Sequence, residues 1–128
     1  DFVLWGNTPG STLQFDVLPE LALFNGAIQP PYSARGAGAL SEMEVTSLAF
    51  PLLATQSVCG YAISPTGAEK MIKACLPLTS TTVPAANPAD GSMAAQTLQQ
   101  LMSLHYSTMK AFVCVPPLCM TDAAAPSL

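Results

Sequence analysis

The chain has 128 residues, a formal net charge of −4 and only 9% charged residues. Its length fits one domain, since domains commonly contain about 100–150 residues. The 4 basic residues are too few and too scattered to neutralise nucleic-acid phosphates, which argues against a nucleic-acid partner. No apolar run reaches the roughly 18–20 residues that span a bilayer, so we expect no membrane span.

The low charge also bears on the surface of the molecule. Soluble domains usually carry about 25% charged residues, whereas this chain carries 9%. Apolar residues make up 50% of the chain. Two alternatives follow from this composition. Either the surface is rich in Ser, Thr, Ala and Pro, or a partner domain or protein subunit covers part of it.

The first third of the chain is expected to hold little regular structure. Residues 2–5 form a short β-like run, and residues 7–10 (Asn-Thr-Pro-Gly) are a strong turn signal. Residues 11–42 lack clear periodicity and contain three prolines. They predict a long loop with a short strand near residues 21–24.

The centre of this loop supplies candidate binding residues. Long ordered loops in compact domains are often functional, and Tyr32 and Arg35 lie in the middle of this one. We therefore take Tyr32 and Arg35 as candidate substrate-binding residues. Residues 42–54 then place apolar side chains near helical spacing and predict a helix, which Pro51 weakens.

The middle of the chain carries the clearest elements. Residues 57–63 are apolar and predict the best strand. A helix follows, with Thr66 as its N-cap and Glu69 completing a capping box, and Pro77 ends it. Its apolar face has the helical spacing i, i+3, i+4 and i+7 and consists of Ala68, Met71, Ile72 and Cys75.

A second loop and a second helix follow. Residues 79–92 are rich in Ser, Thr, Pro, Ala and Asn, which predicts a loop. A helix is then expected from residue 91 or 92 to residue 104. Asp90 or Ser92 can cap this helix, because both side chains accept a hydrogen bond from the first free backbone N–H groups.

The end of the chain completes an α/β pattern. Residues 108–115 predict a second good strand, and residues 121–128 a loose tail. Helices that alternate with strands argue for an α/β fold. The expected fold class is therefore α/β, a partial layer with a few strands and two or three helices. Such a thin sheet suggests further strands upstream or from a partner.

Four cysteines and one histidine bear on metal and redox chemistry. The cysteines form no paired Cys-x-x-Cys knuckles, which argues against structural zinc. Cys59 and Cys114 lie in apolar strand-like runs and are expected to be buried thiols, while a disulfide that involves Cys119 stays open. His105 ends a predicted helix, a place that favours interaction with the helix dipole over pairing with a nucleophilic cysteine.

Three segments of the chain carry a family resemblance. They are residues 59–70 (Cys-Gly-Tyr-Ala-Ile-Ser-Pro-Thr-Gly-Ala-Glu-Lys), residues 1–6 (Asp-Phe-Val-Leu-Trp-Gly) and residues 110–118 (Lys-Ala-Phe-Val-Cys-Val-Pro-Pro-Leu). The first resembles the strand-to-helix element of glycosyltransferase family 25, the lipooligosaccharide and collagen sugar transferases. The second is similar to that family's strand ending in Gly after the acidic metal-binding motif, and the third to its late strand running into prolines.

The resemblance implies that residues 1–120 are the C-terminal part of a GT-A-like domain, which transfers a sugar from a nucleotide-sugar donor. In this fold type an Asp-x-Asp motif and a divalent metal hold the donor diphosphate, and the metal offsets charge on the leaving group. The chain contains no Asp-x-Asp, and Glu42-x-Glu44 is interpreted as a solvated helix start. Metal and nucleotide-sugar are therefore expected only with the missing half, and activity of this chain alone is not expected.

Asp90 is the candidate catalytic residue under the same resemblance. It best matches an acidic residue that often follows the loop after the capped helix in this family. A carboxylate there could orient or deprotonate an acceptor hydroxyl. Its competing role is to cap the second helix, and the local pattern favours that role.

Three functions therefore remain in competition. The first is a glycosyltransferase-like domain of which this chain is the acceptor-side part. The second is a non-catalytic subunit or structural component of a larger assembly, which the low charge favours. A small secreted disulfide domain is a third alternative.

Overall fold

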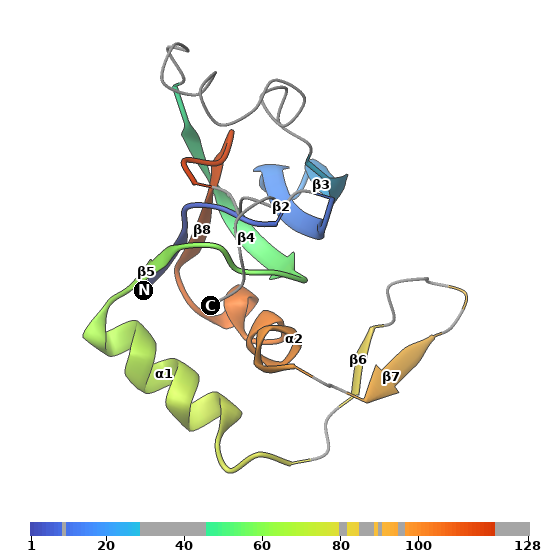
Figure 1. The fold of residues 1–128 in the computed structure, drawn as a ribbon, viewed down its shortest axis with the longest axis vertical. Coiled ribbons are helices and arrows are strands. Elements are labelled where there is room, and N and C mark those ends of the chain that lie inside the picture. The colour runs from blue at the N-terminus through green and yellow to red at the C-terminus, as the bar shows by residue number, and fades with distance from the viewer. Residues whose placement is uncertain are drawn as a thin grey trace, which may run out of the picture.

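The structure, a computed structural model, describes residues 1–8, 10–28, 46–79, 82–84, 89, 91–94 and 97–119. Its elements are β1 (Phe2–Leu4), β2 (Thr12–Leu18), β3 (Ala22–Ala27), β4 (Leu48–Thr55), β5 (Tyr61–Ile63), α1 (Pro65–Cys75), β6 (Thr82–Pro84), β7 (Ser92–Ala94), α2 (Leu98–Ser103), the 3-10 turn η4 (Tyr106–Thr108) and β8 (Ala111–Val115). A mixed sheet with two helices confirms the α/β class that the sequence predicts (Figure 1).

The main sheet has six strands in the order β3-β2-β4-β8-β1-β5. Strands β1 and β8 run parallel, and the other neighbouring pairs run antiparallel. Strands β6 and β7 pair separately as a two-stranded ribbon. The six strands and two helices fit the expected partial α/β layer, and the sheet is wider than the sequence suggested.

Strand β2 shows that the loop expected over residues 11–42 is wrong in its described part. Leu13 and Phe15 are buried while their neighbours are partly exposed, the alternation of a strand with one face on a core. Strand β3 confirms the short strand expected near residues 21–24. The alternation in β2 was present in the sequence, but turn-forming residues on both sides masked it.

Strand β4 replaces the helix expected over residues 42–54, of which residues 46–54 are described. Leu52 is buried and Phe50 packs against the core, so the core-facing residues are two apart, as in a strand. Pro51 lies opposite Phe112 of β8. Short apolar runs fit helices and strands equally well by periodicity, and here pairing with β2 and β8 decides the outcome.

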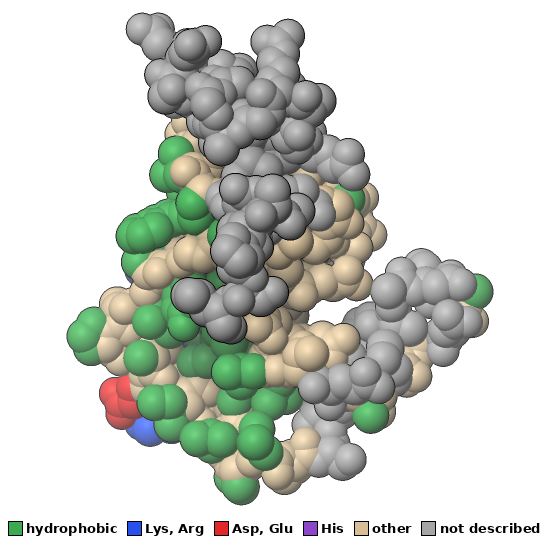
Figure 2. All heavy atoms as spheres, viewed as in Figure 1, with side chains coloured by type: hydrophobic (Ala, Val, Ile, Leu, Met, Phe, Trp, Pro, Cys, Tyr) green, Lys and Arg blue, Asp and Glu red, His purple; other side chains and the backbone are tan. Residues whose placement is uncertain are grey.

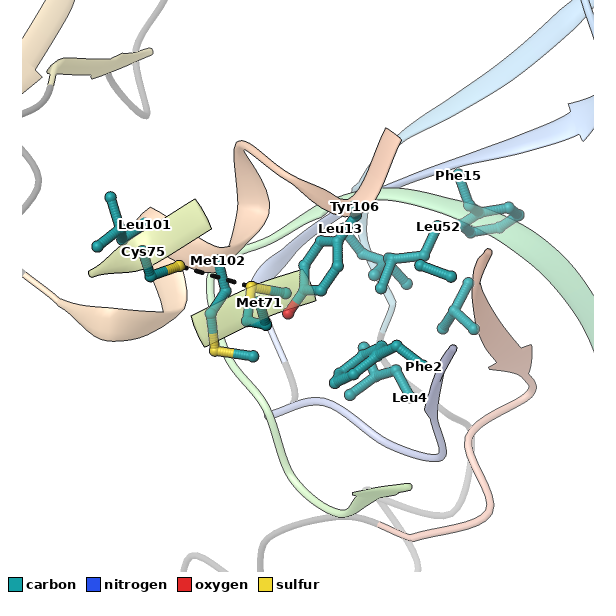
Figure 3. Close-up of a cluster of buried hydrophobic side chains, with 12 residues drawn as sticks. Phe2, Leu4, Leu13, Phe15, Leu52, Met71, Cys75, Leu101, Met102 and Tyr106 are labelled. Carbon is teal, nitrogen blue, oxygen red and sulfur yellow. Dashed lines mark hydrogen bonds between the residues drawn. The ribbon is translucent and has the colours of Figure 1, made fainter. Parts of the chain in front are cut away.

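The core lies between one face of the sheet and both helices (Figure 3). Phe2 occupies its centre, because its ring centroid lies 5.2 Å from that of Tyr61 and 5.0 Å from that of Tyr106. The buried set comprises Phe2, Leu4, Leu13, Phe15, Leu52, Met71, Cys75, Leu101, Met102, Tyr106, Ala111 and Val113.

The N-cap of α1 is Ser64, and the cap predicted at Thr66 is wrong. The Ser64 hydroxyl accepts a hydrogen bond from the Gly67 backbone N–H at 3.0 Å. Thr66 lies inside the helix, and Glu69 pairs with Lys73 at 2.6 Å. Pro65 starts the helix two residues earlier than the capping-box pattern indicates, since proline suits the first helical turn.

The first turn of α1 packs directly on the backbone of Asp1. The Ser64 N–H donates to the Asp1 carbonyl oxygen at 2.9 Å, and a Cβ atom at Gly67 would overlap with that same oxygen. The Lys70 ammonium group lies 2.6 Å from the Asp1 carboxylate. Glycine is therefore required at position 67 by the close approach of α1 to the start of β1.

Helix α2 begins later than expected, and neither Asp90 nor Ser92 caps it. Ser92 lies in β7, and Thr97 is the N-cap. The Thr97 hydroxyl accepts from the Gln100 N–H, and the Gln100 side chain accepts from the Thr97 N–H, both at 3.2 Å. This reciprocal pair is a capping box, and it explains why the helix starts at Leu98.

Two strands are shorter than predicted. Strand β5 occupies only the last three of residues 57–63, and β8 begins at Ala111 instead of residue 108. The stretch before β8 is taken up by η4, whose Tyr106 faces the core. None of the helices in the described part of the chain is long and apolar enough to cross a membrane.

The cap of α1 leads to a paired prediction. We expect Ser64→Ala to lower the free energy of unfolding by about 1 kcal/mol, because it removes the acceptor for the Gly67 N–H. Thr66→Ala should leave stability unchanged within about 0.5 kcal/mol, because Thr66 is exposed and lies within the helix. Urea unfolding of both variants measures the difference. A larger loss from Thr66→Ala than from Ser64→Ala would contradict the observed cap.

Candidate functional site

The residues predicted from the sequence to form a site lie outside the described part of the chain. This holds for the candidate substrate-binding residues Tyr32 and Arg35 and for the candidate catalytic residue Asp90. The acidic pair Glu42 and Glu44 also lies outside it. The roles of these side chains therefore stay predictions.

The carboxyl ends of β1 and β8 form the edge of the sheet at which a ligand is most expected. These two strands are the parallel pair of the described sheet. In open α/β sheets, ligands bind outside the carboxyl ends of parallel strands. Trp5 follows β1 at this edge, is 43% exposed, and accepts a hydrogen bond from the Leu118 N–H at 2.7 Å through its carbonyl oxygen.

A small polar cluster continues from this edge. The Ser11 and Ser57 hydroxyl oxygens lie 2.6 Å apart, and Ser57 also accepts from the Thr8 N–H at 2.9 Å. Asn7, which is buried, donates to the Ser11 hydroxyl at 3.4 Å. These groups are neutral and bond to one another. The cluster therefore holds the turn after β1 in place and supplies no acid or base of its own.

One face of the sheet carries no helix of the described structure. Because Val3 pairs with both Ala62 and Phe112, these side chains lie in one row on the face opposite the core. We call this surface the open face; it consists of Val3, Trp5, Ala49, Pro51, Ala62, Phe112 and Cys114. All of these residues are at least partly exposed, and none is charged. Parallel strands usually have both faces covered, so this exposure is unusual.

An apolar groove of about 450 Å³ lies between β5, α1 and α2. Figure 2 shows hydrophobic side chains over much of the surface around α1, with few charges among them. Ile72 was expected to face the core, but it is 59% exposed at this groove. The groove offers mostly apolar contacts, from Tyr61, Ile63, Ala68, Met71, Ile72, Cys75, Leu76, Leu78, Leu98 and Met102.

The Tyr106 hydroxyl lies buried behind this groove. Tyr106 is 1% exposed, and its oxygen has no hydrogen-bond partner among the described residues. Burial, and next the proximity of Tyr61 and Cys75, raise the pKa of Tyr106. Tyr106 contributes its ring to the core through Phe2, while its hydroxyl contributes no bond that the structure records.

Two cysteines that the sequence predicted to be buried, Cys59 and Cys114, are not. Cys59 and Cys114 are partly exposed, whereas Cys75 is buried beneath α1 and donates to the Met71 sulfur at 3.5 Å. Burial raises the pKa of Cys75 and of Cys114. In the described ranges, no three His, Cys, Asp or Glu side chains lie close enough to hold a metal ion.

Comparisons of the chain with known protein families, with curated proteins and with solved structures give no match. A function is therefore supported only by the residues themselves and by their arrangement. The arrangement contributes two features that the sequence did not indicate, the open face and the apolar groove. Both depend on strand order, which periodicity does not encode.

The unpartnered hydroxyl predicts an unusual response to Tyr106→Phe. The variant keeps the ring contact with Phe2 and should be more stable by about 1 kcal/mol, because it removes a buried group without a hydrogen bond. Urea unfolding at neutral pH measures this change. Tyr106→Leu is the control and should be destabilised, since it loses the aromatic contact.

The raised pKa of Tyr106 adds a test in alkali. Unfolded tyrosine loses its proton near pH 10, whereas folded Tyr106 keeps it to higher pH. Above about pH 10 the folded state therefore holds one more proton than the unfolded state, at Tyr106. The contribution of protonated Tyr106 to the free energy of unfolding is fully present below about pH 10 and is lost as the pH rises further. Tyr106→Phe should lose less stability above pH 10 than the parent chain. An equal loss in both proteins would contradict the buried position of the hydroxyl.

Proposed function

We propose that the chain is the acceptor-side part of a glycosyltransferase domain similar to family 25, which transfers a sugar from a nucleotide-sugar donor. One observation carries this proposal. The three segments that resemble the family, residues 1–6, 59–70 and 110–118, are far apart in the sequence and contain the three neighbouring strands β1, β5 and β8. Segments inherited from one ancestral site region are expected to be neighbours in this way.

The register of these strands adds support. Leu4 of β1 lies opposite Tyr61 of β5 and Val113 of β8, so the three segments contribute to one continuous part of the sheet. The segment over residues 59–70 contains β5 and the start of α1, which agrees with a strand-to-helix element. Its Gly67 has a specific structural role, because only glycine allows the first turn of α1 to contact Asp1.

The proposal assigns the acceptor chemistry to Asp90. Its carboxylate would accept the proton of an acceptor hydroxyl as the sugar is transferred. The competing role for this residue was the N-cap of the second helix, and Thr97 takes that position. The capping alternative for α2 therefore no longer accounts for an acidic residue at position 90.

The proposal assigns none of this chain's residues to binding the nucleotide-sugar donor. The described residues offer no group of side chains that could hold a metal ion. Under the resemblance, a divalent metal and the nucleotide diphosphate are bound by an Asp-x-Asp motif encoded upstream of Asp1. The role proposed for Asp90 concerns the acceptor hydroxyl and does not involve that metal.

Reading the gene upstream of Asp1 and assaying the complete encoded protein test the proposal. We expect an Asp-x-Asp motif shortly before Asp1, and release of nucleoside diphosphate from a panel of nucleotide-sugars with Mn²⁺ and hydroxyl acceptors. Asp90→Asn should lower the transfer rate about 100-fold or more. It should leave the Kd of the donor unchanged, because the proposed role concerns the acceptor.

Asp16→Asn serves as the matched control, since Asp16 lies on β2 opposite Leu23, away from β1 and β8. Its transfer rate should equal that of the parent protein. Absence of the acidic motif from the reading frame would exclude an active enzyme of this type. Full activity of Asp90→Asn would remove the role assigned to Asp90 while leaving the enzyme class standing.

The alternative function, a non-catalytic subunit of a larger assembly, is favoured by the open face. Trp5 and Phe112 are 43% and 37% exposed on this uncharged surface, which adjoins the parallel strands β1 and β8. A protein surface of this kind is commonly an interface with another domain or subunit. The partner in this alternative is a protein with a matching apolar surface.

The open face predicts self-association of the isolated chain. We expect size-exclusion chromatography with light scattering to give species larger than the 13.3 kDa monomer. Phe112→Glu places a charge on the open face and should shift the population towards monomer. Leu21→Glu is the control, because Leu21 is 85% exposed in the turn between β2 and β3 and should have little effect. A monodisperse monomer of the parent chain would contradict the alternative.

A further inference from the structure

Two cysteines from distant parts of the chain meet beside the end of β1. The Trp5 N–H donates to the Gly60 carbonyl oxygen at 2.9 Å, and the Cys59 N–H donates to the Gly6 carbonyl oxygen at 2.9 Å. The Leu118 N–H donates to the Trp5 carbonyl oxygen at 2.7 Å. The segment before β5 is thus hydrogen-bonded to Trp5 and Gly6, and the segment after β8 is hydrogen-bonded to Trp5.

This arrangement places the Cys119 sulfur against Cys59. The Cys119 thiol donates to the Cys59 carbonyl oxygen at 2.8 Å across a separation of 60 residues. Cys59 and, after it, Cys114 also act electrostatically on the Cys119 thiol. The Cys119 sulfur therefore lies against the backbone of Cys59 in the reduced protein.

Two glycines provide the space for the Cys119 sulfur. A Cβ atom at Gly60 would lie 2.6 Å from that sulfur, and one at Gly6 would lie 2.9 Å from it. Gly60 also has a φ of +84°, a conformation that other residues rarely adopt. A side chain at either position would push the sulfur away from Cys59.

We propose that Cys59 and Cys119 are a disulfide-forming pair that fastens the segment after β8 to the segment before β5. A disulfide of this kind needs two sulfurs on backbone segments that already lie within one side-chain pair of each other. The contacts of Cys119 with Cys59 meet that requirement. The proposal does not depend on Asp90, the residue to which the proposed function assigns a role.

A low-molecular-weight disulfide, such as oxidised glutathione, is the oxidant. The thiolate of one cysteine attacks a glutathione sulfur, which forms a mixed disulfide and releases one glutathione thiolate. The thiolate of the second cysteine then attacks the protein-bound sulfur and releases the second glutathione. In total, two protein thiols become one disulfide, and one small disulfide is reduced to two thiols. Burial, and next the proximity of Cys59, raise the pKa of Cys119, which makes its attack slow.

The other two cysteines are matched controls. Cys75 is buried beneath α1, where it donates to Met71, and should stay reduced. Cys114 lies on β8 and is the competing partner for Cys119. Trypsin cleaves after Arg35, Lys70, Lys73 and Lys110, so it separates Cys59 and Cys75 but leaves Cys114 and Cys119 on one peptide. Cys114→Ser is therefore needed to assign the bond.

The test is to equilibrate the chain with oxidised glutathione, block free thiols under denaturing conditions, and analyse tryptic peptides by mass spectrometry. We expect two of the four thiols to be lost, with peptide 36–70 linked to peptide 111–128. The link should persist in Cys114→Ser and in Cys75→Ser and should be absent from Cys119→Ser. Oxidation should raise the Tm by roughly 10 °C, because the bond closes a long loop.

Three outcomes would overturn the proposal. They are four free thiols at the oxidising limit, a glutathione adduct without the internal link, and a link that disappears in Cys114→Ser. The parent chain and Cys114→Ser decide the matter even if Cys119→Ser does not fold, because the linked peptides are read from folded, oxidised protein. Circular dichroism of each reduced variant shows whether it folds.

Discussion

Strand β1 is the constraint on which the rest of the structure depends, because it is only three residues long and joins β5 to β8. Its Phe2 and Leu4 are 1% and 0% exposed. Phe2 contacts Tyr61 of β5 and Tyr106 of η4, so one side chain connects the sheet edge to the turn beneath it. The residue before this strand supports α1, and the residues after it hold the segments that contain Cys59 and Cys119.

The second constraint is that both helices lie on one side of the sheet. Antiparallel sheets tolerate one solvated face, but parallel strands rarely do. The parallel pair β1 and β8 leaves Val3 and Phe112 on the open face, whose residues as defined above carry no charge. Part of the low charge of the chain is therefore explained by the uncharged residues of the open face. An upstream half of the same domain and a separate subunit are both coverings that would remove this exposure.

The sequence predicted the local elements best where one periodicity dominated. The apolar spacing around Met71 and Cys75 located α1, and both side chains are buried. The same reasoning failed for β4, because a short apolar run fits either a helix or a strand until neighbouring strands pair with it. The sequence reasoning also misplaced the N-caps of both helices, because several nearby Ser, Thr and Asp residues could each act as an N-cap. The candidate site residues Tyr32, Arg35 and Asp90 remain predictions of the sequence alone.

The sequence by itself determined the α/β class, helix α1 and the shortage of charge, and the proposed sugar-transferase resemblance rests on three of its segments. Those properties depend on composition or on contacts between residues close in the chain. Only the tertiary structure decided that the three segments are neighbours, that one sheet face is open, and that Cys119 meets Cys59. Strand order and the space left by Gly6 and Gly60 set these contacts. Neither is encoded in local periodicity, because both arise between residues that only the folded chain brings together.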